Sequence, residues 1–122
     1  LNQTGACFDS SGGFDLPNGA NRSPDAAWVR KDRLRALPAI DWEAFLPLCP
    51  DFVIEIRSRT DRLSSLQSKM QEYIDNGASL GWLLDPISKR AWIYRPGQQI
   101  EVIEEPVALS GDPVLPGFTL QL

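Results

Sequence analysis

A carboxylate set into an apolar run is the feature of this chain best suited to chemistry. Glu55 lies within residues 51–57 (DFVIEIR), whose composition is typical of a buried β-strand. Removing water from an ionised glutamate is costly, so a metal ion such as Mg²⁺, a cation or hydrogen-bond donors must replace that water. The structural alternative is a solvated edge strand, or a pairing of Glu55 with an arginine that serves only the fold.

The strand predicted over 51–57 separates its side chains onto two faces, because successive residues of a strand point in opposite directions. Its polar face is a candidate site, and Asp51 is a second acidic candidate at its start. Because Pro50 precedes Asp51, a role in entering or capping the strand is equally compatible with this position. The face with the charged side chains carries Asp51, Val53, Glu55 and Arg57, and the opposite face, which is expected to pack, carries Phe52, Ile54 and Ile56.

The chain contains no histidine and only two cysteines, Cys7 and Cys49. Ser-His-Asp catalysis, Cys-His catalysis and Cys/His zinc sites therefore lack their parts. Any metal would have to be held by oxygen ligands, which favours magnesium, manganese or calcium. The two cysteines could form a disulfide, but two buried free thiols are expected in a cytoplasmic protein.

Length and composition predict one globular domain. The chain has 122 residues, of which 43% are hydrophobic and 23% charged, and this is enough for one hydrophobic core. No apolar run could span a bilayer and no signal-peptide pattern is present, so we expect a cytoplasmic protein without a membrane partner. Because the chain opens on Leu1 rather than Met, we expect 1–122 to be a single domain that lacks an N-terminal segment of the full protein.

The formal net charge is −4, but its distribution is uneven. Between Arg22 and Lys69 the chain has nine Lys or Arg against seven acidic residues. This segment could meet phosphates, or it could be a solvated face whose charges balance locally. The tryptophans are expected in the core rather than as base-stacking platforms, because three of the four fall in predicted strands. They are Trp28, Trp42, Trp82 and Trp92.

The elements that must position Glu55 are mostly strands. Turn signals at 11–13 and 17–19 predict a hairpin over 10–21. A strand–helix–strand order over 51–85 predicts a right-handed crossover between parallel strands of a mixed sheet. The other predicted elements are a strand over 25–29, an irregular connection over 30–49 with one helical turn near 42–46, strands over 80–85, 90–94 and 99–104, and a last short strand over 116–122.

A long helix is predicted over 62–76, with Thr60 or Asp61 as its N-cap and Gly77 as the left-handed residue after its end. Lys69 lies at the edge of its apolar stripe. The ammonium group could therefore reach the neighbouring strand, or lie in solvent like an ordinary surface lysine. The stripe, which would cover a sheet, consists of Leu63, Leu66, Met70, Tyr73 and Ile74.

Two short motifs resemble a known nuclease signature. In the PD-(D/E)XK superfamily a Pro-Asp on one strand and a Glu-x-Lys on the adjacent strand form a metal-dependent phosphodiesterase site, and Ser23-Pro24-Asp25 with Glu55-Ile56-Arg57 is similar to that pair. The chain resembles most closely the bacterial Uma-type restriction endonuclease-like family, long catalogued as a domain of unknown function. That likeness spans most of the chain through the segments GGFDLPNG, RSPDAAWV, PDFVIEIRS, WLLDP and LPGF.

The resemblance implies an α/β fold, a restriction endonuclease-like α/β/α core with a mixed central sheet and added antiparallel hairpins. It also implies a metal-dependent DNA endonuclease that hydrolyses phosphodiester bonds, with Asp25 and Glu55 holding Mg²⁺ or Mn²⁺. Lys69 would replace the motif lysine and stabilise charge that develops on the phosphate. Arg57 stands at the motif lysine's position; it cannot act as a base, but it could hold a phosphate, orient water or only neutralise Glu55.

Two departures from the pattern leave other functions open. Arg57 replaces the motif lysine, and no helix before residue 10 supplies the further glutamate that related nucleases often carry. A nuclease fold with a degenerate site would be a nucleic-acid-binding or assembly module, and a plain structural domain is a third hypothesis. The expected partner is nucleic acid, DNA rather than RNA, and a homodimer is expected if both strands are cut.

Overall fold

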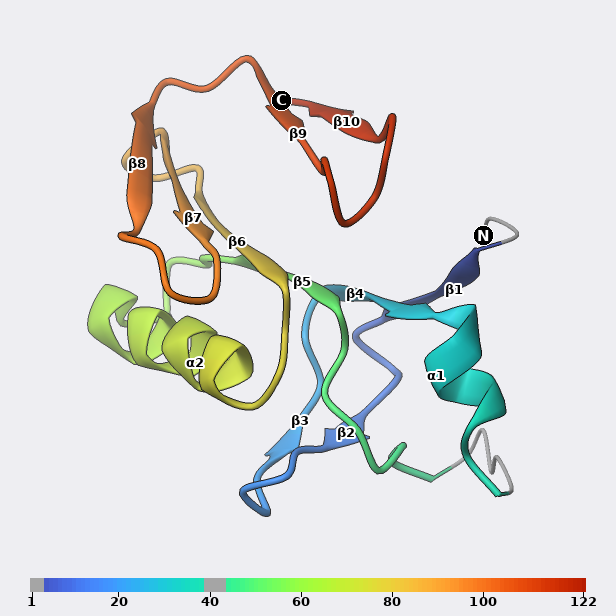
Figure 1. Cartoon of the computed structure of the whole chain (residues 1–122). Coiled ribbons are helices and arrows are strands. Elements are labelled where there is room, and N and C mark those ends of the chain that lie inside the picture. Colours follow the sequence, from blue (N-terminus) through green and yellow to red (C-terminus); the bar gives the residue numbers. More distant parts are fainter. Residues whose placement is uncertain (1–3, 39–43) are drawn as a thin grey trace.

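The computed structural model describes residues 4–38 and 44–122, which form a six-stranded mixed sheet with one long helix against it (Figure 1). The strands follow the order β1-β4-β5-β6-β7-β8, and every neighbouring pair is antiparallel except β5 and β6. The elements of this sheet are β1 (Gly5–Asp9), β4 (Ala26–Arg30), β5 (Phe52–Ile56), β6 (Leu80–Asp85), β7 (Arg90–Tyr94) and β8 (Glu101–Glu104). The others are β2 (Phe14–Asp15), β3 (Asn21–Arg22), α1 (Lys31–Arg35), α2 (Leu63–Asp75), β9 (Ala108–Ser110) and β10 (Thr119–Gln121).

Helix α2 connects the parallel strands β5 and β6 and covers one face of the sheet. Its residues Leu66, Met70 and Tyr73 are buried, as the apolar stripe predicted. The helix ends as expected at Gly77, which has φ +119°. The backbone N–H groups of Gly77 and Ala78 donate to the carbonyls of Ile74 and Tyr73, so the last turn leaves few carbonyls unpaired.

The predicted start of α2 is wrong. The residue before the helix is Arg62, and its side chain makes no capping hydrogen bond. The Asp61 carboxylate instead accepts hydrogen bonds from the backbone and hydroxyl of Ser58, at 2.9 and 2.8 Å. Because Asp61 is used by this tight turn, it is not available to cap the helix.

The opposite face of the sheet is covered by the hairpin of β9 and β10. Leu109 and Leu115 from this segment pack in one cluster with Phe52 and Trp82 of the sheet. Phe118 stacks on Trp82 with ring centroids 6.1 Å apart. The expected fold class, mixed α/β with a mixed central sheet and antiparallel hairpins, is therefore confirmed. Among the described residues, the layer opposite α2 is this hairpin and not a second helix.

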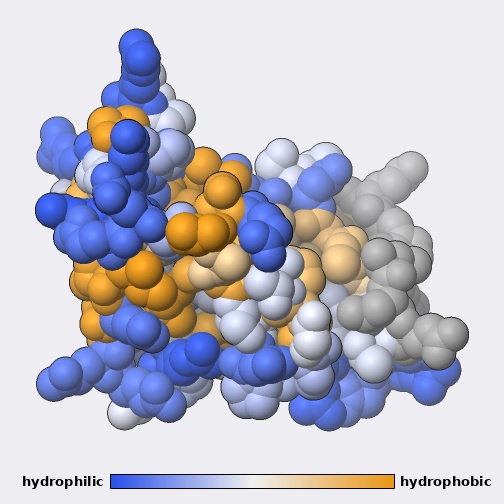
Figure 2. All heavy atoms as spheres, turned by 90° about the horizontal axis from the view of Figure 1, so that it is seen from above, coloured by the Kyte–Doolittle hydropathy of each residue, from blue (hydrophilic) through white to orange (hydrophobic). Residues whose placement is uncertain are grey.

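This hairpin side of the molecule is also where apolar side chains reach the surface. Figure 2, which looks at the molecule from above, shows hydrophobic residues grouped on this surface with hydrophilic residues around them. A hollow of about 560 Å³ is lined by Ile56, Leu84, Pro106 and Leu122. Ile56 was expected to pack, but 49% of it is exposed because β5 ends there.

Three elements in the described ranges were not predicted, and one of them is β9, which pairs with β10. Strand β1 pairs with β4 over five residues, from Gly5 opposite Arg30 to Asp9 opposite Ala26. Helix α1 lies where the sequence predicted an irregular connection, and it is short but buries Leu34. The helical turn predicted near 42–46 falls partly outside the described residues, and Leu46 forms a parallel bridge with Phe14 instead.

The cysteines and tryptophans follow the predictions in part. Cys49 is buried, and burial raises the pKa of its thiol to about 11, but Cys7 is exposed. The expectation of two buried thiols is thus wrong for Cys7, which lies on the edge strand β1. Trp28, Trp82 and Trp92 are buried as expected, whereas Trp42 lies outside the described residues.

None of the helices within 4–38 and 44–122 is long and apolar enough to cross a membrane.

Candidate active site

Asp25 and Glu55 meet because β4 and β5 are antiparallel neighbours. The register pairs Ala26 with Ile54, so the next residues along each strand, Asp25 and Glu55, lie opposite each other. The backbone N–H of Asp25 donates to Glu55 Oε1 at 3.3 Å, and the backbone N–H of Ile56 donates to Asp25 Oδ2 at 2.7 Å. Each carboxylate is therefore held by the backbone of the other strand. Sheet register thus joins two acids that are far apart in the sequence.

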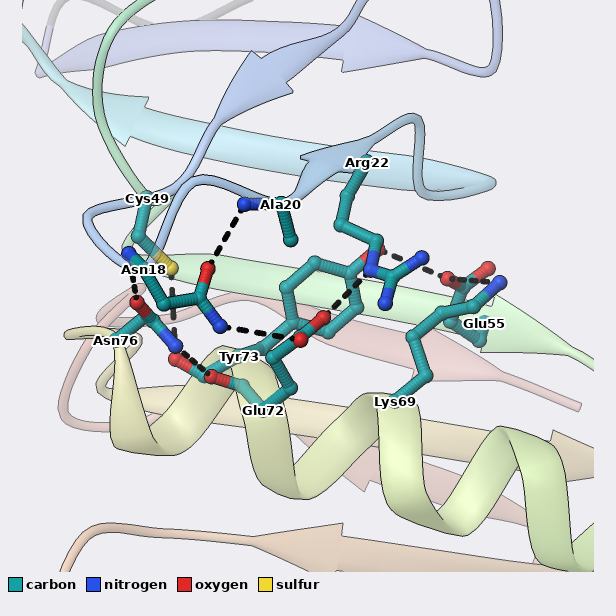
Figure 3. A network of polar contacts seen from close by, with 9 residues as sticks. All are labelled: Asn18, Ala20, Arg22, Cys49, Glu55, Lys69, Glu72, Tyr73 and Asn76. Atoms are coloured by element: carbon teal, nitrogen blue, oxygen red, sulfur yellow. Dashed lines mark hydrogen bonds and ion pairs between the residues drawn. The ribbon is translucent and has the colours of Figure 1, made fainter.

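Glu55 is buried, with 4% of the residue exposed, and its carboxylate is surrounded by polar partners from α2. The Tyr73 hydroxyl donates to Glu55 Oε2 at 3.0 Å, and Lys69 Nζ lies 3.5 Å from the same oxygen (Figure 3). Burial raises the pKa of Glu55 above its ordinary value, although Lys69 and the Tyr73 hydroxyl oppose this effect. The carboxylate is thus both desolvated and positioned.

Lys69 reaches the strand rather than lying free in solvent. Its side chain is one third exposed, and its ammonium forms the ion pair with Glu55. The helix therefore places a cation beside the carboxylate while part of the lysine side chain stays exposed.

Arg57 forms neither a hydrogen bond nor an ion pair with Glu55. Its guanidinium lies 2.9 Å from Asp85 Oδ2, and the Asp85 side chain is fully buried at the end of β6. Asp85 also accepts hydrogen bonds from the Ser88 hydroxyl and from the backbone N–H groups of Ile87 and Ser88. The sequence left open that Arg57 only neutralises Glu55. In the structure Arg57 does neutralise a carboxylate, but it is that of Asp85.

Asp51 lies at the other end of β5 from the Asp25–Glu55 pair. Its carboxylate accepts from the Arg30 backbone N–H at 2.8 Å and lies 3.0 Å from Arg33 Nη1. These contacts attach the start of β5 to β4 and α1. Of the two roles that the sequence allowed, the structure therefore supports strand entry.

Several residues around Glu55 were not predicted for the site. Arg22 Nε forms a short ion pair with Glu72, and Asn18 Nδ2 donates to the other carboxylate oxygen of Glu72 at 3.1 Å. The hydrogen bond from Arg22 is the main cause of a lowered pKa of Glu72. The spacing along α2 could have predicted that Glu72 and Tyr73 lie near the site. They follow Lys69 by three and four residues, so all three side chains share one face of the helix.

The donor set fits a hard divalent cation. Asp25 and Glu55 provide carboxylate oxygens, and Mg²⁺ is commonly held by one or two such carboxylates together with water and substrate phosphate. Within the described part of the chain, no group of three or more His, Cys, Asp or Glu could hold a metal ion. The arrangement therefore suits an open site that a phosphate completes, and it does not suit a closed cage of protein ligands.

We expect Tyr73→Phe to lower the free energy of unfolding by about 1–2 kcal/mol, because a hydrogen bond to the buried Glu55 carboxylate is lost. It should also weaken Mn²⁺ binding, measured by calorimetry, because Glu55 loses part of what orients it. Urea denaturation measures the stability change.

The matched control is Tyr94→Phe. The Tyr94 hydroxyl is buried without a hydrogen-bond partner among the described residues, so its removal should cost nothing or stabilise the protein. Equal effects of the two substitutions would contradict a positioning role for Tyr73.

The structure brings two acidic residues together on neighbouring strands and adds a lysine from the crossover helix, which is the arrangement that the resemblance to restriction endonuclease-like nucleases implies. A family model described as "Uma2: Putative restriction endonuclease" matches residues 1–122. The chain therefore belongs to the Uma2 family.

A solved structure supports the fold. The chain is similar to a "putative nuclease belonging to DUF820" from Anabaena variabilis, with a TM-score of 0.82 and 23% sequence identity. The match covers 98% of this chain and 66% of that chain. No curated protein matches the sequence.

Proposed function

We propose that this chain is a Mg²⁺- or Mn²⁺-dependent endonuclease domain that hydrolyses phosphodiester bonds in DNA. The observation that carries the proposal is the juxtaposition of Asp25 and Glu55, with Lys69 Nζ 3.5 Å from Glu55. Membership of the Uma2 family supports a nuclease. The metal ion, the substrate and the roles of the catalytic residues are our proposals, and these contacts support them.

The proposed roles follow from where each side chain lies. Asp25 and Glu55 would hold the metal ion, which would supply positive charge to polarise the scissile phosphate and to activate the attacking water. Tyr73 keeps Glu55 in one orientation. Lys69 would stabilise negative charge that develops on the phosphate oxygens, because its ammonium is close to Glu55 and its side chain is partly exposed.

Plasmid cleavage with Mg²⁺, with Mn²⁺ and with EDTA tests the proposal. We expect nicking with either metal and none with EDTA. Asp25→Asn should reduce the rate about a hundredfold or more, because the neutral amide is a poor ligand for a hard cation. Asp75→Asn is the control, since Asp75 lies at the exposed end of α2 and contacts Gln71. Cleavage in EDTA, or full activity of Asp25→Asn, would contradict the metal-dependent mechanism.

A second candidate function is a nucleic-acid-binding or assembly module with a degenerate site. The observation that favours it is Arg57, which occupies the motif lysine's position and is bound to Asp85. DNA binding without cleavage, by folded protein supplied with metal, would support this module instead.

Three further expectations belong to the proposal. DNA is preferred over RNA as the substrate, the location is cytoplasmic, and a homodimer would pair two sites for double-strand cleavage. Sedimentation with and without duplex DNA would test the homodimer.

A further inference from the structure

We propose that Arg22 binds a phosphate of the nucleic-acid backbone beside the Asp25–Glu55 pair. This inference rests on the proposed action on DNA and adds a substrate-binding residue to that site. Arg22 lies at the end of β3, three residues before Asp25, and its side chain is 35% exposed.

The guanidinium of Arg22 is held at its Nε, and its terminal nitrogens keep hydrogens that they can donate. Its Nε is bound by Glu72, and no hydrogen bond from its terminal nitrogens occurs within the described residues. Figure 3 shows the guanidinium between the carboxylates of Glu72 and Glu55. The planar group therefore keeps donors for a phosphate, which an arginine can bind through two parallel hydrogen bonds.

Glu72 is itself held in place, so it provides a firm support for Arg22. Asn18 Nδ2 donates to Glu72 Oε2, and the Asn18 backbone N–H donates to Asn76 Oδ1. Asn76 Nδ2 in turn donates to the Glu72 backbone carbonyl at 2.9 Å. The β2–β3 turn is thereby attached to the end of α2, and less side-chain entropy is lost when Arg22 meets a ligand.

The charges around the site explain why such a cation is needed. Asp25 and Glu55 repel a phosphate until their charge is compensated, and Lys69 is already paired with Glu55. Arg57, two residues after Glu55 in the sequence, already donates to Asp85 from a terminal nitrogen, whereas Arg22 is bound only through its Nε. The hydrogen bond that Arg22 donates to Glu72 raises the pKa of Arg22, and the charge of Glu55 adds to this effect.

Binding of a fluorescein-labelled DNA duplex, measured in EDTA over a range of KCl concentrations, tests the inference without cleavage. We expect Arg22→Gln to weaken binding about tenfold. It should also reduce the slope of log K against log salt by about 0.9, the value for one lost phosphate contact. Arg22→Lys keeps the charge but loses the planar fork, so it should retain the slope and bind several-fold more weakly than the wild type.

The matched control is Arg35→Gln, which removes the same charge from α1, beyond the other end of β4. If Arg22→Gln and Arg35→Gln change affinity and slope equally, or if Arg22→Gln binds like the wild type, the inference is overturned. Thermal unfolding followed by circular dichroism will establish whether each variant is folded. If Arg22→Gln does not fold, Arg22→Lys serves as the test.

The outcomes also separate this inference from the proposed nuclease activity. Selective loss of binding in Arg22→Gln supports the inference even if the wild type does not cut DNA. Cleavage by the wild type with normal binding by Arg22→Gln overturns the inference alone. A wild type that neither binds the duplex in EDTA nor cuts plasmid DNA with Mg²⁺ or Mn²⁺ overturns both, and one that cuts DNA but does not bind it in EDTA overturns the inference alone.

Discussion

Glu55→Gln is expected to abolish metal-dependent DNA cleavage, with a rate loss of about a thousandfold or more. The amide has nearly the same shape as the carboxylate and can still accept the hydrogen bond from Tyr73, so the substitution removes mainly the charge. A divalent cation is bound through this negative charge, and Glu55, of which 4% is exposed, has little water nearby that could take its place. Single-turnover cleavage with Mg²⁺ and with Mn²⁺ measures the loss.

The same substitution should leave the protein at least as stable as the wild type at neutral pH. Burial raises the folded-state pKa of Glu55, so the ionised form is disfavoured by folding. Wild-type stability in the absence of metal should therefore fall as pH rises from the unfolded pKa through the raised folded one, and Glu55→Gln should lack this dependence. Glu55→Ala should instead be destabilised by about 2 kcal/mol, because Tyr73 and Lys69 lose their partner.

Glu101→Gln is the control for charge removal, since Glu101 is an exposed residue on the edge strand β8. The Glu101→Gln variant should cleave DNA at the rate of the wild type. Full activity of Glu55→Gln, with calorimetry showing unchanged Mn²⁺ binding, would refute the assignment of Glu55 as a metal ligand.

Arg57→Ala is expected to lower the free energy of unfolding by about 3 kcal/mol and the melting temperature by roughly 10 °C. The reason is that the Asp85 side chain is fully buried and would lose its charged partner. Hydrogen bonds from Ser88 and Ile87 would remain, which limits the loss. Urea and thermal denaturation measure the change.

The effect of Arg57→Ala should depend on pH. Burial alone would raise the pKa of Asp85, but hydrogen bonds from Ser88 and Arg57 outweigh it, and the pKa is lowered. A lowered folded-state pKa contributes stability that is present above the unfolded pKa and is lost as pH falls through the folded one. The difference between the wild type and Arg57→Ala should therefore be largest at neutral pH and shrink on acidification.

Arg59→Ala is the matched control, because Arg59 is exposed and follows Arg57 by two residues. It should leave stability unchanged. If Arg57→Ala kept full stability but lost cleavage, Arg57 would belong to the catalytic set, as the sequence suggested, and the structural assignment would be wrong.

Local patterns predicted the part of the fold that carries the candidate site. The apolar run before Arg57, the helical stripe around Met70 and the glycine at position 77 each act over a few residues, and β5, α2 and β6 form accordingly. The resemblance to a nuclease motif selected Asp25, Glu55 and Lys69, which the structure brings together. Strands β1 and β9 and helix α1 were missed because the strands depend on pairing with β4 and β10 and the helix on packing of Leu34.

By itself the sequence determined the strand–helix–strand unit, the family resemblance and the candidate acids. Only the tertiary structure decided which partner each charged side chain takes: Arg57 pairs with Asp85, Arg22 with Glu72, and Tyr73 with Glu55. These partners are 28, 50 and 18 residues apart along the chain. Sheet register and helix docking set such contacts, and neither is encoded in the local periodicity from which the elements were predicted.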